Sequence, residues 1–107
     1  MRTPAMIEIA FRVPAKFAPR RAEKIIERVA QEFDLIEGMK SPLASFPGSI
    51  HWHYKKKGER GTLELTLWPA EKKIWAQVQD GRKADWIFEE LPQIRRTIEA
   101  ALRSRAR

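Results

Sequence analysis

The segment from Ser49 to Asp80 alternates between apolar and polar residues in three successive runs. The runs cover residues 50–57, 62–68 and 73–79, and two short stretches with turn-forming residues, 58–61 and 69–72, separate them. A period of two residues is typical of a β-strand that buries one face. The pattern therefore predicts three antiparallel strands joined by two tight turns.

The two turns fix the strand register that we expect. A turn at 58–61 pairs Lys57 with Thr62, Lys55 with Glu64, His53 with Thr66 and His51 with Trp68, and a turn at 69–72 pairs Trp68 with Lys73, Thr66 with Trp75 and Glu64 with Gln77. A slip by one residue would bury the lysines, so the pattern constrains which residues share a face.

This arrangement divides the three strands into an apolar and a polar face. The apolar face holds Ile50, Trp52, Tyr54, Leu63, Leu65, Leu67, Ile74, Ala76 and Val78. The polar face holds His51, His53, Lys55, Lys57, Thr62, Glu64, Thr66, Trp68, Lys73, Trp75, Gln77 and Gln79. The apolar face needs a cover from the rest of the chain, and we expect the polar face to remain open.

The flanking sequence predicts one more strand and two helical regions. We expect a half-buried strand at 5–13, a helix at 19–36 that Gly38 ends, a covering loop at 39–48, and helical segments at 84–90 and 92–103 separated by a break near Pro92. The basic residues Arg103, Arg105 and Arg107 suit the end of the last helix.

These elements predict an α+β fold of two layers in the order β-α-β-β-β-α. Its antiparallel meander has helices packed on one sheet face. The chain of 107 residues is long enough for one domain, residues 1–107, and too short for two. The patterning leaves open whether the first strand lies beside the second or the fourth.

The chain is basic, with 21 lysines and arginines against 14 acidic residues and a formal charge of +7. Such a charge favours anionic partners, although it can also serve solubility alone. There are no cysteines, which excludes disulfides and thiolate metal sites. Without an apolar run of membrane-spanning length or a signal-peptide pattern, we expect a cytoplasmic protein without membrane contact.

The only histidines, His51 and His53, point to the same side of their strand. Zinc requires three or four ligands, and Glu64 is the one further candidate as a diagonal neighbour of His53. We therefore expect no metal and no cofactor. No catalytic motif is present, so an enzyme is not expected, and a small hydrolase or metal site around these three residues ranks only third.

The polar face is the candidate binding surface because it combines basic side chains with two indole rings. Its candidate binding residues are His51, His53, Lys55, Lys57, Trp68, Lys73 and Trp75. Cations beside aromatic rings are typical of single-stranded nucleic-acid surfaces. The sequence thus predicts a small non-enzymatic binding module for an anionic partner, with nucleic acid as the first hypothesis.

Two other interpretations of the polar face stay open. The face can instead serve a homodimer or another protein interaction without nucleic acid, since tryptophan is enriched at interfaces. Alternatively, Trp68 and Trp75 lie beneath the chain's own termini, while Trp52 and Trp86 belong to the core. No motif in the chain identifies a family.

Overall fold

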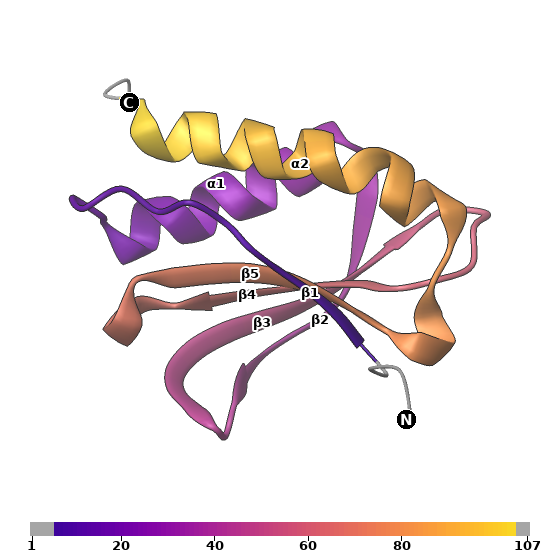
Figure 1. Ribbon diagram of the computed structural model, residues 1–107, viewed down its shortest axis with the longest axis horizontal. Helices are drawn as coiled ribbons and strands as arrows, with labels where there is room; N and C mark the ends of the chain where they lie inside the picture. Colours follow the sequence, from indigo (N-terminus) through magenta and orange to yellow (C-terminus); the bar gives the residue numbers. More distant parts are fainter. Residues whose placement is uncertain (1–5, 105–107) are drawn as a thin grey trace.

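Five antiparallel strands form a single sheet in the order β1-β5-β4-β3-β2 (Figure 1). The structure is a computed structural model and describes residues 6–104. The elements are β1 (Met6–Ala10), α1 (Pro19–Glu32), β2 (Leu35–Leu43), β3 (Phe46–Lys56), β4 (Leu63–Trp68), the 3-10 turn η1 (Pro69–Glu71), β5 (Lys73–Gln79), the 3-10 turn η2 (Asp80–Arg82) and α2 (Asp85–Arg103). Arg105, Arg107 and Ala5, with which the predicted first strand begins, lie outside the described residues.

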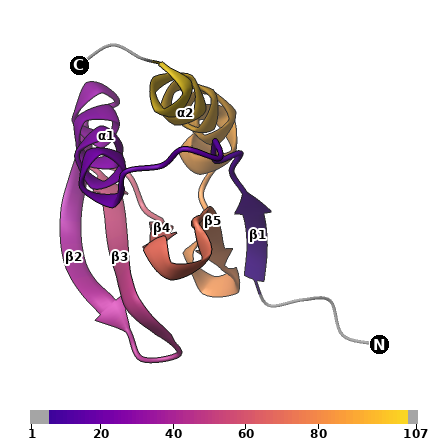
Figure 2. The same ribbon diagram turned by 90° about the vertical axis from the view of Figure 1, so that its left-hand side faces the viewer.

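Both helices cover the same face of the sheet, which confirms the predicted two-layer α+β fold. Figure 2 shows α1 above the β2–β3 side and α2 above the β5–β1 side. The predicted apolar face is the one beneath the helices: Ile50 is partly buried, and the other eight residues are at most 2% exposed. Between residues 6 and 104, no helix has the length and apolar character needed to cross a membrane.

The predicted end of the first helix and the predicted loop after it are wrong, because β2 occupies this stretch. The helix ends at Glu32, and Asp34 adopts a left-handed conformation with a φ of 60°. Aspartate tolerates this conformation better than most residues. The chain therefore reverses at Asp34, and Leu35 begins a strand where the sequence predicts a continuing helix.

Strand β2 is irregular, which explains why its pattern predicts a loop. Its pairing with β3 is interrupted between Glu37 and Met39 and again between Ser41 and Leu43. The second interruption contains Pro42, which has no N–H for the strand ladder.

Ion pairs connect β2 to α1. The Lys40 ammonium lies 2.7 Å from carboxylate oxygens of both Glu23 and Glu27 in α1. Hydrogen bonds to these carboxylates, with that to Glu23 the larger cause, raise the pKa of Lys40.

The predicted break near Pro92 is also absent, and α2 runs continuously through this residue. An interior proline costs about 3 kcal/mol because it removes one helical hydrogen bond and crowds the preceding turn. Buried residues on both sides of Pro92 hold the helix against the sheet, namely Trp86, Ile87, Leu91, Ile94, Ile98 and Leu102. Pro92 itself lies on the exposed side. Tertiary packing thus outweighs the local cost.

The register of the second predicted hairpin is confirmed, whereas that of the first is displaced by two residues. In β4 and β5, Glu64 faces Gln77, Thr66 faces Trp75 and Trp68 faces Lys73, as predicted. In β3 and β4, however, His51 faces Thr66 and His53 faces Glu64. The connection runs from Lys57 to Thr62, longer than the predicted four-residue turn. A displacement of two keeps every side chain on its predicted face but changes its neighbours.

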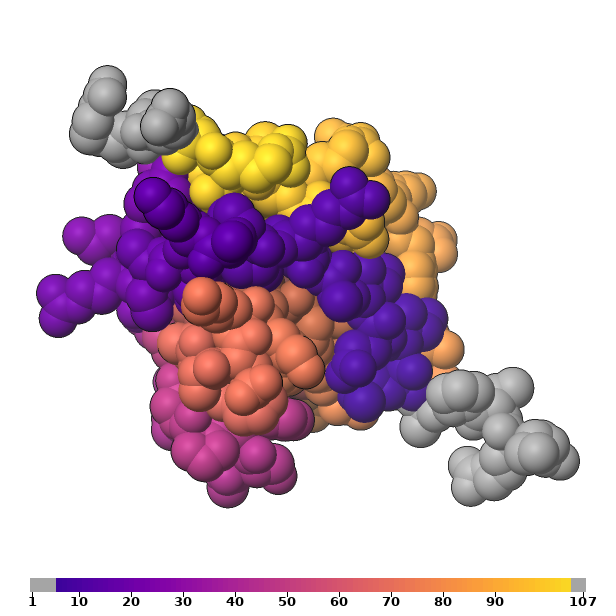
Figure 3. All heavy atoms as spheres, turned by 60° about the vertical axis from the view of Figure 1, so that its left-hand side comes forward, coloured from indigo at the N-terminus to yellow at the C-terminus, as the bar shows by residue number. Residues whose placement is uncertain are grey.

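The segment after β1 closes one end of the two layers. Figure 3 shows it in indigo, between α2 in yellow and the β4–β5 connection in orange. The Phe11 N–H donates to the carbonyl of Ile74 at 2.9 Å, and the Arg12 N–H donates to the Glu99 carboxylate at 2.7 Å. These bonds tie the segment to β5 and α2, and β1 itself pairs antiparallel with β5, which places the first strand at the edge of the sheet beside the last one.

The connection between β3 and β4 gives a first testable prediction. Gly61 has a φ of +98°, and an added Cβ would lie 2.6 Å from the Ala84 Cβ and 3.0 Å from the Arg82 carbonyl oxygen. Gly61→Ala should lower the free energy of unfolding by about 2 kcal/mol because of backbone strain and this clash. Urea unfolding followed by circular dichroism measures the change.

Gly81→Ala is the matched control, since a Cβ there meets nothing within 4 Å and its backbone is outside the left-handed region. It should leave stability unchanged within about 0.5 kcal/mol. Equal effects of the two substitutions would contradict the packing described around Gly61.

Candidate functional site

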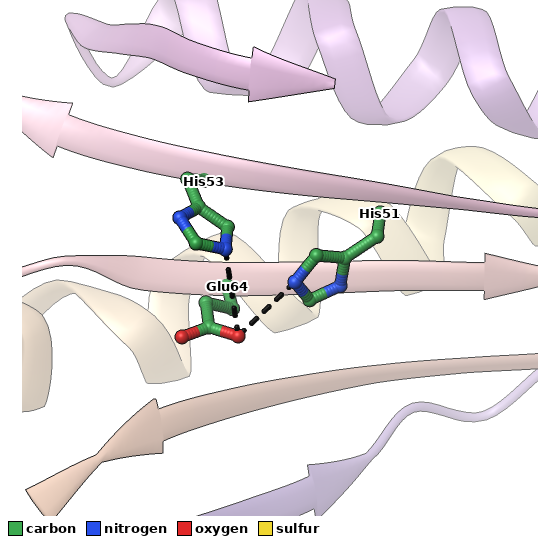
Figure 4. Close-up of side chains that lie close together, drawn as sticks. All are labelled: His51, His53 and Glu64. Carbon is green, nitrogen blue, oxygen red and sulfur yellow. Dashed lines mark ion pairs between the residues drawn. The ribbon is translucent and has the colours of Figure 1, made fainter. Parts of the chain in front are cut away.

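Glu64 lies in the central strand β4 with its side chain on the outer face, the sheet face turned away from the helices. This side chain is only 3% exposed. Its Oε1 atom lies 3.1 Å from His51 Nε2, 3.2 Å from Gln77 Nε2 and 3.7 Å from His53 Nε2. Figure 4 shows both imidazole rings directed at the same carboxylate. The outer face therefore has a buried acidic centre.

The other nitrogen of His51 is also engaged, because Nδ1 lies 2.7 Å from the hydroxyl oxygen of Thr66. Burial lowers the pKa of His51, outweighing the opposing effect of the Glu64 charge, so the ring is neutral at neutral pH. A carboxylate only accepts hydrogen bonds, which places the ring proton on Nε2 and makes Nδ1 the acceptor for the Thr66 hydroxyl. Thr66, His51 and Glu64 thus form a connected chain of hydrogen bonds.

The structure separates the candidate binding residues into two groups. His51, His53 and Lys55 lie around Glu64 and Thr62, with Lys57 exposed in the following loop. Trp68 and Lys73 face each other where β4 meets β5. Trp75 lies between the groups, opposite Thr66. The predicted set is therefore not one continuous basic and aromatic surface.

The expectation that the indole rings form an open surface is wrong for Trp75, which is only 9% exposed. Phe46, from the end of the β2–β3 hairpin, packs edge-on against Trp68 and Trp75 with ring centroids 4.8 and 5.2 Å apart. The Trp68 indole also donates to the carbonyl of Pro47 at 3.0 Å. The cover over these rings is the chain's own hairpin, which bends away from the helices (Figure 1).

Beside the buried centre is a shallow basic hollow, which we define by its lining residues. It has a volume of about 330 Å³ and is lined by His53, Lys55, Arg60, Gly61, Thr62, Gly81 and Arg82. Three of these residues are cationic and none is acidic. The buried Glu64 lies beside the hollow, and its Oε2 is 3.5 Å from the Arg82 guanidinium. The hollow can therefore receive an anion from the solvent side.

Backbone contacts hold the two arginines of the basic hollow in place. The Thr62 N–H donates to the Arg82 carbonyl at 3.0 Å, and the Trp86 indole donates to the Arg60 carbonyl at 2.8 Å. The sequence prediction did not include Arg60 or Arg82 among the site residues. The topology could have indicated them, because in an antiparallel meander the β3–β4 turn and the C-terminal end of β5 lie at the same end of the strands.

The arrangement supports two kinds of chemistry. The guanidinium and ammonium groups of the basic hollow are suited to oxygen anions. His51, His53 and Glu64 offer three ligand atoms within 4.8 Å of one another, a group able to hold a metal ion. Comparison of the chain with family models, curated proteins and solved structures found no match, so both possibilities depend on the geometry alone.

The burial of Trp75 yields a second prediction. Trp75→Glu should lower the free energy of unfolding by about 3 kcal/mol or more, because it removes a buried ring and places a charge beneath Phe46. Lys73→Glu, an exposed position on the same strand face, is the control and should change stability by less than about 0.5 kcal/mol. Thermal and urea unfolding compare the two. A Trp75→Glu protein as stable as wild type would contradict the hairpin cover.

Proposed function

We propose that the protein is a binding module for a phosphate-bearing anion, with single-stranded nucleic acid as the first candidate. The binding surface is the basic hollow and the exposed Lys57 beside it. The supporting observation is that Lys55, Arg60 and Arg82 come from three different segments and line one hollow without a lining carboxylate. The proposed surface differs from the one predicted from the sequence, which included the indole rings of Trp68 and Trp75.

The charges of the basic hollow are available to a ligand. Arg60 and Lys55 are exposed, and the Arg82 side chain is 49% exposed. Arginine binds phosphate through two parallel N–H groups, which gives orientation as well as charge. Because the whole chain has a formal net charge of +7, its electrostatic field would also attract polyanions from solution toward the hollow. Because Trp75 is buried, we expect phosphate contacts to dominate over base stacking.

A protein-interaction or homodimeric module remains the second candidate, and a specific observation favours it. Ile36 and Met39 in the edge strand β2 are 50% and 40% exposed. An edge strand with exposed apolar side chains is able to pair with another chain. Ile36 pairs with Lys55 and Met39 with His53, so this interaction would lie next to the basic hollow, and separate variants of β2 and of the hollow distinguish the two candidates.

The test uses fluorescence anisotropy with a short labelled single strand at low salt, in the presence of EDTA. The variant Lys55→Ala/Arg60→Ala should bind at least tenfold more weakly than wild type. The slope of log affinity against log salt should fall by about 1.4, since each phosphate contact on a single strand contributes about 0.7. Circular dichroism checks that the variant is folded.

The control is Arg20→Ala/Lys24→Ala, which removes the same charge from a second basic surface on α1. It should retain wild-type affinity. No binding by wild type at tens of micromolar protein, or equal losses in both double variants, would reject the basic hollow as the site. A wild-type dimer in light scattering that Met39→Lys converts to a monomer would favour the second candidate.

A further inference from the structure

The two histidines and Glu64 already have much of the spacing of a metal site. His51 Nε2 and His53 Nε2 lie 3.1 and 3.7 Å from Glu64 Oε1, and all three ligand atoms lie within 4.8 Å of one another. Bonds of about 2.0–2.1 Å in a tetrahedral zinc site place neighbouring ligand atoms about 3.3 Å apart. Two of the three separations are therefore within a few tenths of an ångström of that value.

The backbone holds these ligands on regular strands. His51 and His53 are two residues apart on β3 and share the outer face, and Glu64 is directly opposite His53 on β4. Both strands have a hydrogen-bonded neighbour on each side. Ligands on paired strands are held more precisely than ligands on loops. The sequence prediction of no metal rested on the shortage of ligands, with Glu64 only a diagonal neighbour of His53, whereas the observed register places Glu64 directly opposite His53.

Supporting residues are also in place around the ligands. The Thr66 hydroxyl oxygen lies 2.7 Å from His51 Nδ1 and is able to accept a hydrogen bond from Nδ1–H when Nε2 binds a metal. The Gln77 amide donates to Glu64 Oε1 at 3.2 Å, and its own oxygen accepts from the Trp75 indole at 2.9 Å. Metal-binding imidazoles and carboxylates are commonly oriented by such partners.

A purely structural hydrogen-bond cluster explains His53 less well than it explains His51. The 3.7 Å separation from Glu64 is too long for a hydrogen bond, and within residues 6–104 the structure gives the His53 ring no other hydrogen bond. Its side chain is 22% exposed and lines the basic hollow, so one side of the ring borders open space. A metal ion would give this ring a partner.

We propose that His51 Nε2, His53 Nε2 and Glu64 Oε1 bind a divalent transition-metal ion of the zinc class. Two imidazoles and one carboxylate are a ligand set that zinc uses in proteins. Three protein ligands leave at least one coordination position for water or an anion, as in catalytic zinc sites. Arg82 lies 3.5 Å from the other Glu64 oxygen, and its half-exposed side chain is free to turn toward solvent when the ion enters.

The charge of Lys55 in the lining of the basic hollow favours an anion at the open position. His53 belongs both to the ligand set and to the lining of the basic hollow, so an anion in the hollow lies next to the ion. The metal site does not depend on the proposed function. The two proposals are tested separately, because nucleic-acid binding is measured in EDTA and metal binding is measured without nucleic acid.

The test is titration of the tag-free, metal-stripped full chain with Zn²⁺ by calorimetry and with Co²⁺ by visible absorption. The chain has two histidines and no cysteine, so no other imidazole or thiolate is available. We expect one ion per chain with micromolar or tighter affinity, a rise in melting temperature that a chelator reverses, and cobalt bands typical of four or five ligands. NMR should show both imidazoles shifting together.

Three variants test a metal ligand, a residue that supports a ligand, and a control position. His53→Ala, at the partly exposed position, should weaken zinc binding at least about 100-fold, and Thr66→Val about 10- to 100-fold. Glu8→Gln is the control, because Glu8 is an exposed carboxylate two strands away on the same sheet face. It should bind zinc like wild type.

The absence of saturable binding by wild type at 100-fold excess of Zn²⁺ over micromolar protein would overturn the proposal. So would a folded His53→Ala protein with unchanged affinity. If Thr66→Val, at a fully buried position, fails to fold, His53→Ala together with the wild-type NMR titration still decides the outcome.

Discussion

The burial of the Glu64 carboxylate in the middle of the sheet constrains which residues of the neighbouring strands lie beside it on the outer face. Removing a charged carboxylate from water costs several kcal/mol unless partners replace the lost hydration. These partners come from both neighbouring strands: His51 from β3 and Gln77 from β5, with Arg82 from the following turn. The pairing of β4 with each neighbour must therefore keep this register, or the carboxylate loses its partners.

The sequence predicts the helix-facing side of the sheet well because that side follows a simple rule. Residues such as Trp52, Leu65 and Ala76 alternate with polar ones, and only one choice of face buries them all. The β4–β5 register is equally predictable, since Pro69 begins the turn and Lys72 ends it in a left-handed conformation that fixes its length. Local residue pattern and tertiary packing agree in these elements.

The remaining elements depend on contacts that local pattern does not contain. Strand β2 includes Gly38 and Pro42, and its exposed residues resemble a loop until β3 is present as a pairing partner. The same hairpin carries Phe46 onto Trp75, so a ring that the polar pattern places in solvent is buried. The candidate site follows this division: its histidines and Lys55 were predictable from alternation, whereas Arg60 and Arg82 become neighbours only through the fold.

The cluster around Glu64 is difficult to explain by stability alone. Well-packed apolar residues at buried ionic positions are often as stabilising as the ion pairs they replace, or more so. Here β4 carries Leu63, Leu65 and Leu67 on one face while the other buries a carboxylate, and His51 and Thr66 are buried beside it. Departures from apolar packing tend to occur where function requires them. The basic hollow beside this cluster is where an anion or the open side of a bound ion would meet solvent, which is why we propose a function for this end of the sheet.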